Sequence, residues 1–546
     1  MTLADPPLRA ILDDRGVFRR HAAAVLFLVV WTCAVAPGVI AVRDLTGPYD
    51  LDGFRDVAIA QAIRDGGSPF ADPLYRGHSA WYPPLVPALT ALVSLVTGAG
   101  VPASHVQAGS WFNALAPLAF FWCARTLVGV WPALAAACAF LLLPGRPPAW
   151  ASATYSPWLF PAIFAQSGIY LGLAFWASTL ERPTPSRIVF AGVILGLTLL
   201  AHSGGAALLA GTMMATSWFA CWGNARISHR IATVAVPPVV ALLVCLPFLA
   251  PLATQYSFHV LNRLPATWID EARQPLAALG GLARPGAWLQ LALVAVGLWW
   301  IRARVRPMAK VVLTAWFLVA MSLYAYSVLT QSRQWPALMP AYHFYFLLRA
   351  WKWLAFGCGV VAATEMAVAR WNARGKRRIQ KDTAQAVVVI LFVAAVYPRY
   401  LGREAFREAP RIARQISLAD ERRLHDWIRE HTHLDAVFLA DDIDALTLVG
   451  PSGRAVVSVP PAFSNPYVDH RMRATARDRM VNALENGDVE LLQALVGQFG
   501  VTHVLARNRT IDYLRQQTAL VHEVSSAGSV VVFELRRRGA EAKPRS

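Results

Sequence analysis

The chain has 546 residues, of which 56% are hydrophobic and only 15% are charged, and its formal net charge is +18. A soluble enzyme carries about 25% charged residues, so this composition excludes a soluble globular protein and a disordered chain. The Lys and Arg residues fall mostly in short loops between apolar segments. That pattern is typical of membrane topology and excludes a nucleic-acid-binding protein with one basic patch.

About 20 apolar residues cross a bilayer as a helix. We predict a polytopic α-helical membrane protein with about 11 transmembrane helices, formed by the apolar segments 21–42, 107–126, 130–143, 158–180, 188–201, 203–222, 231–250, 287–301, 310–329, 346–368 and 384–398. With the N-terminus inside, the basic loops Arg302–Lys310 and Arg370–Lys381 then face the cytoplasm, as the positive-inside rule requires. A twelfth apolar stretch, 81–98, would reverse this arrangement if it crossed, so we expect it to lie at the surface or to re-enter the membrane.

The same topology defines the domains. Residues 1–398 are expected to form the transmembrane domain, with an acidic first outer loop at 43–80. Residues 399–546 are expected to form an extracytoplasmic α/β domain, because strand-like runs alternate with helical stretches: strands at 436–440, 455–459, 502–506 and 530–535, helices at 469–497 and 510–519. The sequence therefore predicts a multi-pass protein of the cell (inner or plasma) membrane, whose first loop and C-terminal domain are both extracytoplasmic.

The first outer loop is unusually acidic for this acid-poor chain, with Asp residues at 44, 50, 52, 56, 65 and 72. On a helix, Asp52 and Asp56 are four residues apart and share one side. One interpretation is a solvated loop whose acids cap helices and pair with neighbouring Arg residues. The other is a catalytic base at the water–lipid boundary, since an ionised Asp can accept a hydroxyl proton.

A second group, His343, Arg349 and Lys352, lies near the outer end of the tenth predicted span. Cations inside an apolar stretch are costly unless they reach the interface or meet an anion. Interface anchoring explains them, and a seat for the phosphate of a lipid-linked substrate is the functional alternative. His202 falls in the turn between the fifth and sixth spans, where it either serves the turn or contacts substrate. In the tail, the run 441–444 (Asp-Asp-Ile-Asp) is expected to cap a helix rather than to bind a metal.

Three short patches of the sequence are informative together: Asp52-Gly53-Phe54-Arg55, Trp81-Tyr82-Pro83-Pro84 and Phe463-Ser464-Asn465-Pro466. They resemble motifs of the GT-C superfamily of membrane glycosyltransferases, and within it of the arabinofuranosyltransferases that prime cell-wall galactan in mycobacteria and their relatives. Asp52-Gly53-Phe54-Arg55 resembles that family's Asp-x-x-Phe-Arg motif in the first outer loop. Trp81-Tyr82-Pro83-Pro84 resembles its Phe-Tyr-Pro-Pro, and Phe463-Ser464-Asn465-Pro466 resembles its Tyr-Ala-Asn-Pro. The resemblance implies that Asp52 is the catalytic base, although Asp50 and Asp56 lie so close that the choice among the three stays open. Arg55, Tyr82, His202 and Asn465 are expected to contact substrate.

These observations predict a glycosyltransferase that works on the outer face of the membrane. Nucleotide sugars are absent there, so the donor is expected to be a polyprenyl-phosphate sugar and the acceptor a cell-envelope glycan or lipid. Asp52 would deprotonate the acceptor hydroxyl and the sugar would be transferred with inversion, while Arg349, Lys352 and His343 bind the donor phosphate. A divalent cation, Mg²⁺ or Mn²⁺, would be a further partner for that phosphate, but no residue is assigned as a metal ligand. The alternative is a transporter or flippase of lipid-linked sugars, and the gathering of acids at one membrane face favours the enzyme.

Overall fold

The computed structural model describes residues 6–143, 155–220, 227–262, 285–333, 341–375, 378–416 and 419–536. These residues form two compact units, which are described separately below. Unit 1 comprises residues 1–43, 109–245 and 266–408, whereas unit 2 comprises residues 44–108, 246–265 and 409–546. The predicted division at 398/399 follows hydropathy, whereas the contacts within unit 2 unite the acidic first loop with the C-terminal residues.

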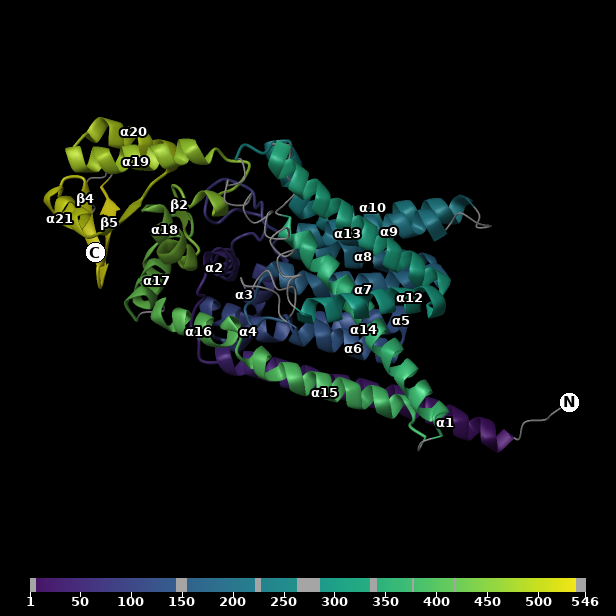
Figure 1. Cartoon of the computed structure of the whole chain (residues 1–546). Coiled ribbons are helices and arrows are strands. Elements are labelled where there is room, and N and C mark those ends of the chain that lie inside the picture. Colours follow the sequence, from purple (N-terminus) through teal and green to yellow (C-terminus); the bar gives the residue numbers. More distant parts are fainter. Residues whose placement is uncertain are drawn as a thin grey trace. The chain divides into compact units, whose positions relative to one another are not determined.

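Helices account for nearly all of the regular structure before the tail (Figure 1). They are α1 (Pro6–Val42), α2 (Leu51–Arg64), α3 (Leu85–Thr97), α4 (Val101–Phe112), α5 (Leu115–Val128), α6 (Val130–Leu142), α7 (Pro161–Glu181), α8 (Pro185–Ala201), α9 (Ser203–Ala220), α10 (Ile227–Tyr256), α12 (Pro285–Arg304), α13 (Pro307–Arg333), α14 (Tyr342–Ala373), α15 (Lys381–Leu401) and α16 (Glu404–Ile416). Each of the eleven apolar segments predicted to cross the membrane coincides with a helix, or, for 107–126, with the pair α4 and α5. A helix is therefore confirmed in each of these segments, within the residues that the structure describes.

Eight helices of the described chain are long and apolar enough to cross a membrane. The windows are His21–Val42, Val101–Val128, Pro161–Glu181, Ile231–Tyr256, Gly286–Arg304, Pro307–Thr330, His343–Ala373 and Lys381–Ile416. Of the other three predicted spans, α6 and α8 are shorter, at 13 and 17 residues, and α9 is not among the eight. The structure is thus that of a polytopic membrane protein. The stretch 81–98 forms the 13-residue helix α3 after Pro84, about 20 Å long and shorter than a hydrocarbon core.

The interior of unit 1 is built around α6 and α14. All residues of α6 from Pro132 to Leu142 are buried, and its Ala-rich sequence lets neighbouring helices approach closely. A Cβ on Gly359 of α14 would overlap the backbone of α12 at Leu293, and a Cβ on Gly297 of α12 would overlap Ala355 of α14. These two glycines therefore set the α12–α14 distance. In Figure 1, α1 and α15 lie side by side, and the Tyr400 hydroxyl donates to the Ala34 carbonyl.

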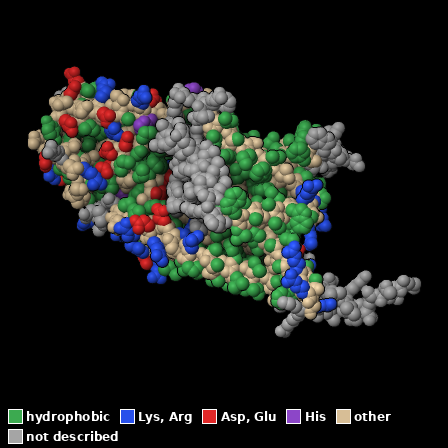
Figure 2. Space-filling model, in the orientation of Figure 1, with side chains coloured by type: hydrophobic (Ala, Val, Ile, Leu, Met, Phe, Trp, Pro, Cys, Tyr) green, Lys and Arg blue, Asp and Glu red, His purple; other side chains and the backbone are tan. Residues whose placement is uncertain are grey.

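Basic side chains gather at the helix ends of unit 1. Figure 2 shows apolar side chains over the face of its helices and Lys and Arg side chains at their ends. Arg306 pairs with Glu181 at 2.8 Å and donates to the Thr126 carbonyl, while Arg304 pairs with Glu365 at 3.3 Å. The ends of α5, α7 and α12 therefore meet at one basic end of unit 1, where Arg304 also reaches α14.

Unit 2 contains a five-stranded sheet in the order β2-β1-β3-β5-β4. Its tail elements are α17 (Ala419–His431), β1 (Val437–Leu439), α18 (Asp442–Asp444), β2 (Ala455–Val456), α19 (His470–Asn486), α20 (Val489–Phe499), β3 (His503–Arg507), α21 (Arg509–Gln516), β4 (Val521–Ala527) and β5 (Val530–Leu535). Strand β1 is parallel to β2 and β3, with Phe438 opposite Val456, and β5 is antiparallel to β3 and β4, with Leu505 opposite Val532. The predicted α/β domain is confirmed as a small mixed sheet with helices.

Alternating strand residues bury both faces of this sheet. Val437 and Leu439 pack with Met480 of α19 and Leu492 of α20. Phe438 points to the other face, where it joins Ile428 of α17 in a cluster that includes Phe54 and Ala58 of the first-loop helix α2. Residues more than 350 positions apart thus share one core.

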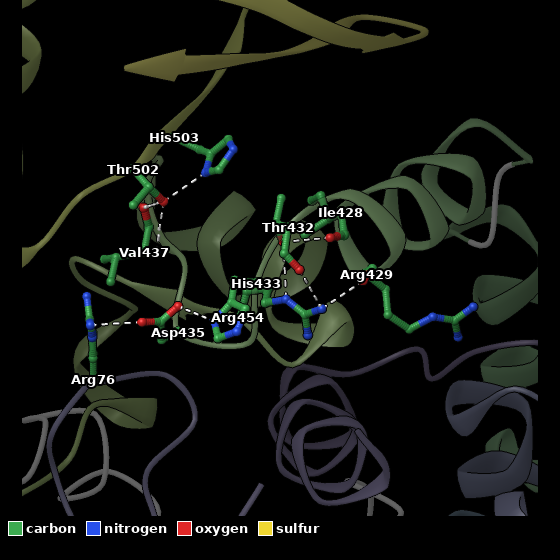
Figure 3. Close-up of polar contacts among 10 residues, drawn as sticks. All are labelled: Arg76, Ile428, Arg429, Thr432, His433, Asp435, Val437, Arg454, Thr502 and His503. Carbon is green, nitrogen blue, oxygen red and sulfur yellow. Dashed lines mark hydrogen bonds and ion pairs between the residues drawn. The ribbon is translucent and has the colours of Figure 1, made fainter. Parts of the chain in front are cut away.

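A buried arginine, Arg454, ties α2 to the tail in unit 2, and Figure 3 shows its contacts with Thr432 and Arg429 of the tail. The side chain of Arg454 is 4% exposed and donates to the Asp65 carboxylate at 3.1 Å, next to the end of α2. It also donates to the Thr432 hydroxyl and carbonyl and to the Arg429 carbonyl at the end of α17, and to the Ser452 carbonyl. Thr502 similarly bridges His503 and the Val437 carbonyl of β1.

The predicted capping role of the run 441–444 is confirmed. Asp441 is the N-cap of α18 and accepts a hydrogen bond from the Ile443 amide. Asp442 and Asp444 pair with Arg477 and Arg507. Each carboxylate thus has a partner within the tail.

Candidate active site

The acidic loop folds around α2, whose first turn is defined by its own residues. Asp50 is the N-cap and accepts a hydrogen bond from the Gly53 amide at 2.9 Å. Asp52 follows in the first turn, where a negative charge is favoured by the helix dipole. Gly53 lies against Pro48, where a Cβ would be 2.5 Å from the proline Cβ. The sequence Pro-x-Asp-x-Asp-Gly therefore starts a helix that presents Asp52.

Arg55 is the centre of this site, and its expected contact with substrate stays a prediction. It is 5% exposed. Its Nε and Nη2 donate to one oxygen of Asp56 at 3.0 and 2.8 Å, and its Nη1 contacts Asp52 Oδ1 at 2.9 Å. The guanidinium carbon lies 3.6 Å from the centroid of the Tyr82 ring, a cation–π contact. Arg55 thus joins both carboxylates to the segment that precedes α3.

The three acids differ sharply in environment. Asp56 is fully buried, and burial raises its pKa to about 6 against the opposing effect of Arg55. Burial and the charge of Asp52 raise the pKa of Asp50 to about 7, while the Gly53 hydrogen bond acts in the other direction. The side chain of Asp52 is 48% exposed. Of these three, Asp52 combines a fixed position with access to a reactant.

Tyr82 is half-buried and forms an edge contact with Trp81 at 5.4 Å between ring centroids. Burial raises the pKa of its hydroxyl further above the ordinary value, so the phenol stays protonated at neutral pH. Tyr82 therefore supports Arg55 with its ring face and retains a donating hydroxyl.

The second predicted group lies on α14 in unit 1. Arg349 donates to the Leu143 carbonyl at 3.0 Å, and Lys352 lies 3.4 Å from Gln290 Oε1 and 4.1 Å from the centroid of the Trp353 ring. The guanidinium carbon of Arg349 lies 5.9 Å from the centroid of the same ring, so both cations lie near Trp353 on one segment of α14.

His202 and His343, which the sequence places 141 residues apart, meet in unit 1. Their ring centroids are 4.8 Å apart. They line a cavity of ≈ 10 Å³, room for about one water, together with Gln166. Nothing in the sequence marked Gln166, an amide inside an apolar helix.

Asn465 is 1% exposed and lies in unit 2. Its amide donates to Asp72 at 3.0 Å and to the Ser79 carbonyl at 3.2 Å, and its oxygen accepts from the Tyr467 amide. Asp72 also accepts from the Leu74 amide, and burial raises its pKa to about 6. Asn465 thus ties the first loop to the tail.

The residues that the structure describes include no group of three His, Cys, Asp or Glu side chains placed to hold a metal ion. Binding of Mg²⁺ or Mn²⁺ stays a prediction, and no step below depends on it.

The fold is similar to that of solved membrane glycosyltransferases, so the resemblance to the GT-C superfamily noted in the sequence is confirmed at the level of the fold. ArnT from Cupriavidus metallidurans bound to undecaprenyl phosphate has a TM-score of 0.55 at 16% identity, over 96% of this chain and 99% of that chain. The Archaeoglobus fulgidus oligosaccharyltransferase has a TM-score of 0.51 at 14% identity, over 88% and 69%. The arabinofuranosyltransferase AftD from Mycobacteria has a TM-score of 0.50 at 14% identity, over 95% of this chain and 40% of that chain. No protein-family model and no curated protein matches the sequence.

Proposed function

We propose that the protein is an inverting membrane glycosyltransferase that uses a polyprenyl-phosphate sugar as donor and a cell-envelope glycan or lipid as acceptor. The observation that carries the proposal is the half-exposed Asp52, held in the first turn of α2 by a buried arginine, in a chain with a GT-C fold. The undecaprenyl phosphate bound to ArnT supports a lipid-linked donor, and AftD supports arabinofuranose as the first sugar to test.

Asp52 is the proposed general base. Its carboxylate takes the proton of an acceptor hydroxyl, whose oxygen forms a bond to the anomeric carbon from the side opposite the phosphate. The bond between that carbon and the phosphate oxygen breaks, and polyprenyl phosphate leaves with the electron pair. Arg55 keeps Asp52 in place, and Asp56 offsets the arginine charge. Arg55 and Asp56 are thus proposed to position Asp52 and not to act on the substrate directly.

Arg349 and Lys352 are the proposed ligands of the donor phosphate, whose growing negative charge they neutralise as it leaves. His343 and His202 belong to the same unit, and their cavity is proposed to contact the donor. Asn465 is proposed to act indirectly, by holding the first loop against the tail. The basic end of unit 1 is proposed to be cytoplasmic, which leaves the acidic loop and the tail outside the cell membrane.

The test is sugar transfer by the full chain in nanodiscs, with radiolabelled polyprenyl-phosphate arabinofuranose, mannose and aminoarabinose as donors. Asp52→Asn should reduce formation of the new glycosidic bond at least about 100-fold. Asp44→Asn, an exposed acid of the same loop, is the matched control and should keep normal transfer. Arg349→Gln and Lys352→Gln should raise the donor KM. Normal turnover by Asp52→Asn would remove Asp52 from the mechanism, and donor movement without a new bond would indicate a flippase.

A further inference from the structure

We propose that the turn that follows α10, residues 257–262, is a membrane-contacting element. Phe258, Val260 and Leu261 would insert into the lipid at the end of this span. The inference goes beyond sugar transfer and does not depend on it.

The first observation is an exposed apolar patch. Phe258 is 53% exposed, Val260 55% and Leu261 51%, although all three are large hydrophobic residues. Single exposed hydrophobic residues are ordinary, but three within four positions form a continuous surface that water solvates poorly. Burial of these three side chains in lipid would remove this apolar surface from water.

The second observation is the backbone of the turn. Ser257 and Phe258 have φ of 49° and 54°, in the left-handed region that residues with a Cβ rarely adopt. Three hydrogen bonds hold this shape: the Ser257 amide to Ala253, the Phe258 amide to Leu252 and the His259 amide to Tyr256. The helix therefore ends abruptly, and the carbonyls of Leu252, Ala253 and Tyr256 in its last turns accept hydrogen bonds within the chain, as a segment in a low-polarity environment requires.

The third observation is that the turn is fastened to the tail within unit 2. The amides of Leu261 and Asn262 both donate to the Pro466 carbonyl, at 2.9 and 3.1 Å. The Asn262 side chain donates to the carbonyls of Asn465 and Val468 and accepts from the His470 amide. The Tyr256 ring stacks on Tyr467 at 5.0 Å. Both ends of the turn are thus fastened to the tail, while the side chains of Phe258, Val260 and Leu261 stay exposed.

Continuity with α10 identifies the occupant as lipid. Five side chains along this helix are large, apolar and about half exposed or more, as expected of a lipid-facing surface: Ile231, Val239, Leu242, Leu243 and Leu246. Tyr256 ends the helix, a position where Tyr is enriched at membrane interfaces. The patch begins two residues later, so it prolongs the lipid-facing surface into the interface. The one polar side chain in it, His259, is compatible with lipid head groups.

The experiment is fluorescence quenching of a bimane label on Val260→Cys in the full chain, reconstituted in phosphatidylcholine nanodiscs. Cys33 and Cys221 are first replaced by Ala, and the other four cysteines are left unchanged because they are buried. Tyr513→Cys on α21, 45% exposed, is the matched control. Phe258→Cys is a second site in case the first variant labels poorly.

We expect lipids brominated near the top of the acyl chain to remove about half or more of the emission at positions 258 and 260, and aqueous iodide to have little effect. The control should show the reverse. Iodide quenching at 260 equal to that at 513 would place the turn in water and overturn the inference. Protection from both quenchers would also overturn it, because another protein surface would then cover the patch.

Discussion

Replacement of Arg55 by Met tests whether this buried guanidinium holds the proposed active site together. The substitution keeps the volume of the side chain but leaves Asp56, fully buried, without its partner. Breaking such a pair costs about 3–5 kcal/mol. The contact with Asp52 adds no more than about 1 kcal/mol, because that carboxylate is 48% exposed and screened by water.

A loss of this size corresponds to a drop in melting temperature on the order of 10 °C for a unit of about 220 residues. The melting temperature is measured on detergent-solubilised protein fused to a fluorescent protein. It is the temperature at which heating removes half of the monodisperse peak in size-exclusion chromatography. The second substitution, Asp56→Asn, removes the uncompensated charge. Arg55→Met/Asp56→Asn should therefore regain more than half of the lost stability.

Sugar transfer should not recover with stability. In the double variant Asp52 has lost its contact with the guanidinium, so transfer should stay at least about 100-fold below the unmodified protein. Full recovery of transfer would show that Arg55 acts only on stability. A single Arg55→Met variant as stable as the unmodified protein would refute the account of the buried pair.

Three further outcomes follow from the structure. The melting temperature should fall as the pH rises from about 5 to about 8. In the folded state Asp50 has a pKa of about 7, and Asp56 and Asp72 have pKa values of about 6, whereas these carboxyls have already lost their protons near pH 4 in the unfolded chain. Asp50→Asn should therefore flatten the upper part of the curve of melting temperature against pH. Gly359→Leu should abolish the monodisperse peak because its side chain overlaps α12, whereas Gly286→Leu, with open space around it, should not. Asn465→Ala should lower the free energy of unfolding by about 2–3 kcal/mol, because its hydrogen bonds to Asp72 and Ser79 are lost. Asp488→Ala removes an exposed N-cap, and an equal loss of stability in that variant would contradict a special role for Asn465.

The helices and the α/β tail could be predicted because their signals are local. Apolar runs mark the helices of unit 1, and short apolar runs mark β1, β2, β3 and β5. The strand β4 was missed because Val521–Ala527, a half-exposed edge strand, contains His, Glu and two Ser and so has no continuous apolar run. The predicted helix at 469–497 is two helices, because Gly487, with φ of 69°, ends α19.

The site could be predicted only in part. The shared face of Asp52 and Asp56 follows from helical spacing, and α2 provides it. The support of Arg55 by Tyr82, the meeting of His202 and His343, and the bond between Asn465 and Asp72 join residues distant in sequence, so no local pattern reports them. Asp50, Asp52 and Asp56 differ in burial, which depends on packing against distant residues and is therefore not visible in their spacing.

The shared core of α2 and the sheet has a consequence for biosynthesis. About 300 residues separate Ala108 from Ala409, so the first loop leaves the ribosome roughly 15–60 s before the segment that covers it. During that interval Phe54, Ala58, Leu74 and Tyr75 have no tail to shelter them. Nascent chains should therefore need a chaperone or the translocation machinery at this point, and a tail transplanted without residues 44–108 would emerge with an open hydrophobic side.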